Sequence, residues 1–251
     1  MIKYLIPILL AGLSLTACQP QSSPEHASSE VHNLDSTITP DSDIEEFIAP
    51  LRDSVEATMQ EVIGQNTRII HPRKPGSPLC NFVADLIREA AENEIDQRAQ
   101  KPLPVIAVIN IRGLRAPLPR GSVEVRDIYA LMPFENQMVI LTHTGQEIME
   151  LFRHMGESNG DGISGASFVY DNGKIKKARI HGEPVSPDAK YYVGTSDYLA
   201  EGGDHYNIFA QAEEKYTSPD RIRHLIIEHI RALTRKNQIV NPSDEKRIII
   251  N

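Results

Sequence analysis

Residues 105–115 read VIAVINIRGLR and decide the fold. The first five, Val105–Ile109, are apolar and mostly β-branched, a pattern typical of a strand buried on both faces. The next six bring an asparagine, a glycine and two arginines directly after that strand. Glycine lets backbone approach a ligand, and arginine offers forked donors that suit phosphate or carboxylate. The stretch predicts a central strand that ends in a polar loop, although a solvated basic turn would also satisfy the loop's sequence.

A helix is predicted well before this strand. Apolar residues recur at helical spacing over residues 44–63, and Gly64 ends the run. Proline cannot sit deep inside a helix, so the regular helix is expected to begin near Ala49, with Pro50 in its first turn.

Capping signals mark three further helices. Ser77-Pro78 is typical of an N-cap followed by a first-turn proline, and Thr144-Gly145-Gln146-Glu147 is a capping-box sequence. These open helices to about Glu94 and Met155, and Ser218-Pro219-Asp220 opens a last one. Strands are expected at 137–143, 166–170, 175–180, 191–195 and 247–250. Because helices and strands mix without strict alternation, we expect a single mixed α/β domain of the α+β class over about 44–251.

The N-terminus has the features of an export signal. Lys3 precedes an apolar stretch, residues 4–13, that is too short to span a bilayer. Leu15-Thr16-Ala17-Cys18 resembles the bacterial lipobox, so residues 1–17 are expected to be a signal peptide and Cys18 a lipidated residue; an ordinary secretory peptide is the alternative. Residues 18–43 are rich in Ser, Pro, Glu and Asp, which predicts a disordered tether. The expected location is exported, lipid-anchored to a bacterial membrane, and periplasmic or at the cell surface.

Composition excludes two classes of protein. The chain has 26 Lys and Arg against 34 Asp and Glu, a net charge of −8, which argues against binding a nucleic-acid polymer. It has only two cysteines, Cys18 and Cys80, so a disulfide scaffold is not expected.

Three loops carry the unusual residues. Besides residues 110–115, these are residues 132–136 (MPFEN) and residues 198–204 (YLAEGGD). Each aromatic alone could be a core residue, and the Gly-Gly-Asp alone a plain turn. Together they describe a nucleoside site, with two aromatic faces for a base, a carboxylate for ribose hydroxyls and arginines for phosphate.

The order of short motifs resembles a known family. SPLCN and AD within residues 77–85, N followed by GLR in 110–115, PFEN at 133–136, TGQE at 144–147 and GGDHY at 202–206 follow one another. In this they resemble the C-terminal, substrate-recognition domain of the 5′-nucleotidase, UDP-sugar hydrolase and 2′,3′-cyclic phosphodiesterase family. The resemblance covers about residues 44–212 and implies that family's fold.

The resemblance implies roles for individual residues. Phe134 would stack on one face of the base, and Tyr198 stands where the family usually has a second stacking Phe. Asp204 would accept hydrogen bonds from the ribose. Arg115 matches the family's phosphate-binding arginine, and Arg73 matches a second one. The other members of the candidate site are Asn110 and Asn136, which would orient the nucleoside, and Arg112, Gly113, Gly202 and Gly203.

Four positions depart from the family pattern. Arg112, Cys80 and His205 each stand where glycine is usual, and Arg112 would either add a phosphate donor or block part of the pocket. Glu135 replaces the glycine of a Pro-Phe-Gly-Asn pattern and would put a negative charge beside the proposed stack.

The catalytic metals of the family are expected elsewhere. Its members carry a metallophosphatase domain before this one, in which two metals activate water and clamp the reacting oxygens. The sequence shows no matching ligand set. His224 and His229, five residues apart on a helix, lie about 140° apart around its axis and so do not converge on one ion. No cofactor is therefore expected in this chain, and two divalent metals are expected in a partner domain.

Three hypotheses follow. The first is the recognition module of a split 5′-nucleotidase, which binds a nucleotide or nucleoside and works with a separate metallophosphatase chain. The second is a free-standing lipoprotein that binds nucleosides or nucleotides for scavenging. The third is a degenerate domain retained for protein–protein contact.

Overall fold

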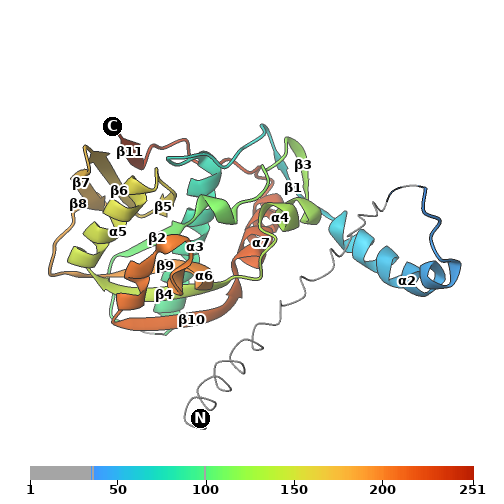
Figure 1. Ribbon diagram of the computed structural model, residues 1–251, viewed down its shortest axis with the longest axis horizontal. Coiled ribbons are helices and arrows are strands. Elements are labelled where there is room, and N and C mark those ends of the chain that lie inside the picture. Colours follow the sequence, from blue (N-terminus) through green and yellow to red (C-terminus); the bar gives the residue numbers. More distant parts are fainter. Residues whose placement is uncertain (1–34, 36, 99) are drawn as a thin grey trace, which may run out of the picture. The chain divides into compact units, whose positions relative to one another are not determined.

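The computed structural model describes residue 35 and residues 37–98 and 100–251 (Figure 1). Pro50–Asn251 form one compact unit, which contains every feature discussed below except the first turns of α2. The predictions of a signal peptide, of lipidation at Cys18 and of most of the tether concern residues outside the described part. None of the described helices is long and apolar enough to cross a membrane.

The helices and strands follow one another without a simple repeat. The α-helices are α2 (Ser42–Met59), α3 (Pro78–Gln97), α4 (Val125–Leu131), α5 (Gly145–Glu157), α6 (Asp197–Ala200) and α7 (Ile222–Arg235). The strands are β1 (Val62–Asn66), β2 (Val105–Ile109), β3 (Gly121–Glu124), β4 (Gln137–Thr144), β5 (Gly162–Ser164), β6 (Ala166–Asp171), β7 (Lys174–Ile180), β8 (Glu183–Pro184), β9 (Lys190–Ser196), β10 (Glu214–Arg221) and β11 (Ile248–Ile250). Short 3-10 turns are η3 (Ile111–Gly113), η4 (Gly203–His205) and η5 (Asn207–Gln211).

A five-stranded sheet of order β10-β4-β9-β2-β5 forms the centre of the unit. β2 and β9 run parallel, whereas the other neighbouring pairs are antiparallel. This mixed sheet with helices on its faces confirms the α+β class. A four-stranded sheet, β11-β6-β7-β8, and the β1-β3 pair complete the unit.

Strand β2 is buried on both faces, as its sequence predicts. Val105, Ala107 and Ile109 belong to the core formed with α3, α4 and α7, whereas Ile106 and Val108 belong to the core formed with α5 and β6. The alternation of side chains along a strand produces this division. The central sheet therefore lies between two hydrophobic cores.

Two of the three capping signals are confirmed. The Ser77 hydroxyl accepts a hydrogen bond from the Cys80 amide at 3.3 Å, and Pro78 occupies the first position of α3. At α5, the Glu147 carboxylate accepts from the Thr144 amide at 2.7 Å, and the Thr144 hydroxyl accepts from the Glu147 amide at 3.4 Å. These reciprocal bonds satisfy amides that a helix N-terminus leaves free.

The prediction for the first helix is wrong at both ends. α2 begins at Ser42 because the Asp41 carboxylate caps it, accepting from the amides of residues 43 and 44 at 3.0 and 3.2 Å; Pro50 therefore lies inside the helix. The helix ends at Met59, and the last predicted residues lie in β1. There Gly64 allows close packing, since a Cβ would clash with Ile230 of α7.

The predicted start of the last helix is also wrong. Ser218, Pro219 and Asp220 lie in an irregular part of β10, where the register against β4 shifts between Thr217 and Arg221. The Ser218 hydroxyl accepts from the Asp220 amide at 3.1 Å, so it stabilises a bend in the strand rather than a helix cap. α7 begins at Ile222.

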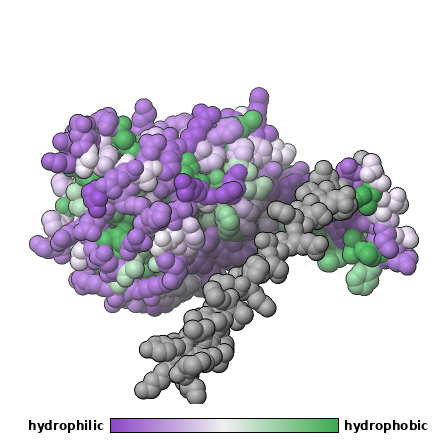
Figure 2. Space-filling view, in the orientation of Figure 1, coloured by the Kyte–Doolittle hydropathy of each residue, from purple (hydrophilic) through white to green (hydrophobic). Residues whose placement is uncertain are grey.

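The surface of the compact unit is largely hydrophilic on the face shown in Figure 2. α2 differs, since none of its residues is buried and four of its large apolar side chains, Ile44, Phe47, Leu51 and Val55, are exposed. Figure 2 shows green surface over this helix.

Candidate functional site

The sheet topology brings the three predicted loops together. β2 and β9 run parallel, so the loops that follow Ile109 and Ser196 leave from the same edge of the sheet. β4 runs antiparallel to β9, with Met138 opposite Ser196, so the loop that enters β4 reaches this edge too. Residues 110–115, 132–136 and 198–204 therefore meet although they lie far apart in the sequence.

These loops enclose a cavity of about 270 Å³. It is lined by Asn110, Arg112, Gly113, Arg115, Phe134, Asn136, Tyr198 and Asp204. All eight belong to the site that the family resemblance implies. The cavity is close in size to the smallest small-molecule pockets, of roughly 300 Å³.

Both aromatic residues of the cavity are exposed. Phe134 is 42% and Tyr198 47% accessible, whereas Phe152 and Phe209 are fully buried in the core. Burial of an aromatic side chain is strongly favourable, so two rings left open toward one cavity are not explained by packing. They provide apolar surface for a flat ligand.

The Gly-Gly bend supports Tyr198 rather than lining the cavity. Gly202 adopts φ +88°, a left-handed conformation that favours glycine. At Gly203 a Cβ would clash with the Tyr198 ring. The two glycines therefore let the chain turn back beneath the ring and place Asp204 beside it.

Asp204 is held by residues of two loops. Its carboxylate accepts a hydrogen bond from the Asn110 carboxamide at 2.7 Å and from the Tyr198 hydroxyl at 3.1 Å. The Asp204 amide donates to the same hydroxyl at 3.2 Å. A phenylalanine at position 198 could make neither bond, so the tyrosine of this chain fixes the carboxylate and its own ring together.

The second asparagine is held in the same way. The Asn136 carboxamide donates to Asp197 at 2.6 Å, and the same carboxylate oxygen accepts from the Tyr198 amide at 2.7 Å. Gly113 leaves room for the first asparagine, since a Cβ there would lie 2.9 Å from Oδ1 of Asn110. Carboxamide–carboxylate bonds thus link the loop after β9 to both other loops.

The two arginines of the cavity keep their guanidinium groups available. The Arg112 side chain is 77% exposed, and the nearest carboxylate oxygen to it, on Asp204, is 3.9 Å away. Arg115 is exposed, and within the described residues its side chain has no hydrogen bond or ion pair. Because two arginines and one carboxylate line the cavity, its lining carries a net positive charge, which favours an anionic ligand. Arg112 lines the cavity and does not fill it.

Arg73 is not part of this arrangement. It is exposed, in the segment before α3, and does not line the cavity.

Sequence reasoning missed the support beneath the first loop. Asp161 is buried; it accepts from the Ile111 amide at 2.8 Å and from the Tyr206 hydroxyl at 2.6 Å. Burial raises the pKa of Asp161, and burial together with this carboxylate raises the pKa of Tyr206. The sequence contains one signal for this pair: Asp161 stands between two glycines, and Tyr206 is the tyrosine of the GGDHY motif.

The remaining departures from the family pattern are accommodated. Glu135 forms ion pairs with Arg221 and Arg223, so its charge beside Phe134 is compensated. His205 is exposed, with φ +66°. Cys80 is buried against Ser77, and burial raises the pKa of its thiol.

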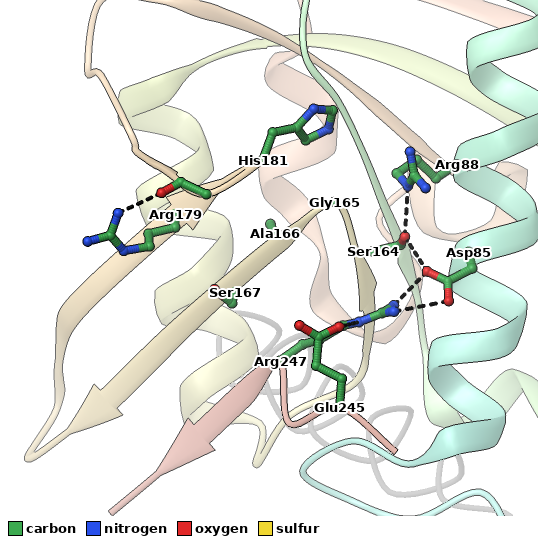
Figure 3. Close-up of a pocket in the computed structure, with 11 residues that line it drawn as sticks. Asp85, Arg88, Ser164, Gly165, Ala166, Ser167, Arg179, His181, Glu245 and Arg247 are labelled. Atoms are coloured by element: carbon green, nitrogen blue, oxygen red, sulfur yellow. Dashed lines mark hydrogen bonds and ion pairs between the residues drawn. The ribbon is translucent and has the colours of Figure 1, made fainter. Parts of the chain in front are cut away.

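A larger cavity, of about 410 Å³, lies between α3, β6 and the segment before β11 (Figure 3). Its main charged groups are bonded to one another. Arg247 donates two hydrogen bonds to Asp85, at 2.6 and 3.0 Å, and a third to Glu245 at 3.0 Å. The Ser164 hydroxyl donates to Asp85 at 2.5 Å and accepts from Arg88 at 3.0 Å. This network holds the C-terminal segment on α3. Arg179, another arginine of the lining, donates to the Gly182 carbonyl oxygen at 2.6 Å instead of pairing with the network.

No group of three or more His, Cys, Asp or Glu side chains in the described part of the chain could hold a metal ion.

Comparison with known proteins relates the chain to nucleotide-processing enzymes. A family model described as 5′-nucleotidase, C-terminal domain, matches residues 55–211. The chain is 30% identical over 105 residues to the protein UshA of Escherichia coli (strain K12), which covers 40% of this chain and 19% of UshA. It is 27% identical over 158 residues to the trifunctional nucleotide phosphoesterase protein YfkN of Bacillus subtilis (strain 168), which covers 57% of this chain and 10% of YfkN.

A solved structure has the same fold. The 5′-nucleotidase precursor from Thermus thermophilus aligns with a TM-score of 0.69 at 21% identity, over 82% of this chain and 42% of that chain. This chain therefore spans less than half the length of each of these three proteins.

Proposed function

Because the chain belongs to the family of 5′-nucleotidase C-terminal domains, we propose that the cavity between its three loops binds a nucleoside or nucleotide. The observation that carries the proposal is the composition of this cavity: two exposed aromatic rings, one fixed carboxylate and two exposed arginines around a single space. Each of these groups suits one part of a nucleotide.

In the proposed complex the base lies against Phe134 and Tyr198. Asp204 accepts hydrogen bonds from ribose hydroxyls; an ionised carboxylate has about four acceptor positions, and Asn110 and Tyr198 use two of them. Arg115 and Arg112 donate to the phosphate. Asn110 and Asn136 hold the loops in place rather than contacting the reacting atoms.

We further propose that hydrolysis takes place on a metallophosphatase domain carried by a separate chain. Such a domain, with two divalent metals, would activate water and stabilise the leaving oxygen. This chain would bind and orient the nucleotide so that its phosphate reaches those metals. The proposal is supported by the family match and by the names of the relatives, of which this chain matches only a part.

A free-standing nucleoside- or nucleotide-binding lipoprotein is the alternative. It is favoured by the combination of rings, carboxylate and arginines in one cavity, which would suffice to bind a nucleotide without a partner. In both proposals the protein is exported and tethered through Cys18, which is inferred from residues 1–18 alone.

Calorimetric titration of the full-length protein in detergent, with adenosine, AMP and ribose 5-phosphate, tests the site. We expect AMP to bind more tightly than either fragment. The same titration with a candidate metallophosphatase present separates the two proposals, since a split enzyme should hydrolyse AMP only in the mixture. The absence of binding to all three ligands would contradict the nucleotide site.

A further inference from the structure

Arg223 of α7 reaches the loop that carries Phe134. It is only 3% exposed, and its guanidinium donates to the carbonyl oxygens of Met132 and Phe134, both at 3.3 Å. The same guanidinium forms an ion pair with Glu135. One buried side chain therefore contacts three of the five residues in the loop.

The guanidinium is also held from the side of α4. Its carbon lies 4.0 Å from the centre of the Tyr129 ring, a cation–π contact. α4 precedes the loop and packs against α7, so Tyr129 and the loop carbonyls enclose the group from two directions. A buried cation needs such compensation, because losing its water is costly.

The ends of the loop are fixed by backbone bonds. The Met132 amide donates to Ile128 at 2.9 Å, and the Ile222 amide donates to the Asn136 carbonyl at 3.0 Å. Between these anchors, Arg223 holds the carbonyl of Phe134 and the side chain of Glu135. The position of the Phe134 ring thus depends on a side chain outside the cavity.

We propose that Arg223 and Glu135 form a positioning pair that sets the Phe134 ring against the cavity and thereby determines the affinity for ligands that carry a base. The part of this proposal that concerns ligand affinity rests on the proposed function, whereas the part that concerns the order of the loop does not. α7 lies beyond residues 55–211, the range matched by the family model, and Glu135 stands where the family resemblance implies glycine. The pair therefore joins a residue inside the matched range to one outside it.

The first test uses fluorescence and needs no ligand. The chain contains no tryptophan, so Phe134→Trp introduces a single reporter into the loop. In that background, Arg223→Met and Glu135→Gln should lower the steady-state anisotropy of the reporter and increase its quenching by acrylamide. Arg231→Met is the matched control, since Arg231 lies on the same helix and pairs with Glu61 and Glu228 away from the loop. Equal anisotropy in all variants would overturn the proposal.

A variant that fails to fold does not end the test. Arg223→Met removes a buried group, whereas Glu135 is exposed, so Glu135→Gln should fold even if Arg223→Met does not. Arg223→Lys keeps the charge but loses the forked donor, and it should recover only part of the order of the loop.

The second test separates a positioning role from a general structural one. With Phe134 in place, Glu135→Gln and Arg223→Met should weaken AMP binding by about tenfold, because a mobile ring contributes less stacking. Binding of ribose 5-phosphate, which has no base, should change by no more than about twofold. An equal loss for both ligands would overturn the positioning role. If the wild-type protein binds neither ligand, the proposed function fails, and the fluorescence result alone decides the fate of the positioning pair.

Discussion

Two cavities of the molecule are lined by arginines that lie beside carboxylates. The arginines differ in whether a carboxylate occupies their hydrogen-bond donors. In the larger cavity Arg247, with its side chain 11% exposed, makes a bidentate pair with Asp85 (Figure 3). In the smaller cavity, between the three loops, Arg112 and Arg115 stay exposed, and Asp204 is held by neutral donors instead.

The difference shows that the size of a cavity does not by itself indicate how many of its charged groups are available to a ligand. A guanidinium that is mostly removed from water must be paired to be tolerated, and that pairing occupies the donors a ligand would need. The exposed arginines of the loops pay no such desolvation cost and keep their donors. We therefore expect substitutions in the first region to change stability, and substitutions in the second to change binding.

The largest effect is expected for Arg247→Met. It leaves the Asp85 carboxylate without its bidentate partner, so the free energy of unfolding should fall by about 2–4 kcal/mol. Urea denaturation followed by circular dichroism measures this, and AMP binding to the folded variant should be unchanged. Arg153→Met, which removes an exposed pair with Glu157, is the control and should cost no more than about 0.5 kcal/mol. Equal losses of unfolding free energy in Arg247→Met and Arg153→Met would show that the buried pair contributes no more to stability than an exposed one.

Phe134→Ala should show the reverse pattern. A stacked base contributes about 1–3 kcal/mol, so nucleoside affinity should fall roughly fivefold to a hundredfold. Because the ring is exposed, the urea midpoint should hardly move. Phe134→Tyr keeps the aromatic face and should retain most of the affinity in calorimetry. A large loss of stability would instead place Phe134 among the core residues.

Arg115→Ala sharpens the comparison within the loop cavity. Adenosine affinity should be unchanged, whereas AMP affinity should fall about tenfold, because a charged hydrogen bond to the phosphate is lost. The matched control is Arg120→Ala, an exposed arginine of the same segment that does not line the cavity. An equal loss for adenosine would show that Arg115 does not contact phosphate.

The smallest effect is expected for Asp204→Asn. The amide keeps one acceptor but loses the charge, so the preference for adenosine over 2′,3′-dideoxyadenosine should fall by about fivefold. Competition between the two nucleosides, measured by calorimetry, gives this ratio directly. A preference that survives the substitution would show that another group recognises the ribose hydroxyls.

Local signals in the sequence were enough for much of this fold. β2 was predicted with its observed bounds because five consecutive apolar residues suit a strand buried on both faces. The caps at Ser77 and Thr144 were predicted because each is complete within four residues. The start of α2 was missed although its cap, Asp41, is a local signal. The other errors arose where distant pairing decides the structure. Val62–Asn66 is a strand because it pairs with Gly121–Glu124, and no periodicity in the sequence shows that partner.

The candidate site shows the same contrast between local signals and distant contacts. The lining residues lie in recognisable loop motifs, and the sheet edge brings them together without any further signal. Three of the residues that support them do not lie in those motifs. Asp161, Asp197 and Arg223 act through hydrogen bonds that span 45 to 91 positions in the sequence. Sequence patterns could therefore predict which residues line the cavity but not these three that hold them in place.

The bonds from Asn110 to Asp204 and from Asn136 to Asp197 have a thermodynamic consequence. Since they link the three loops before any ligand arrives, the loss of conformational entropy that orders the cavity occurs during folding rather than during binding. A ligand then loses mainly its own translational and rotational freedom, which is the condition for appreciable affinity with few contacts. Binding should accordingly proceed with a small change in heat capacity, set by the apolar area of one base and two rings.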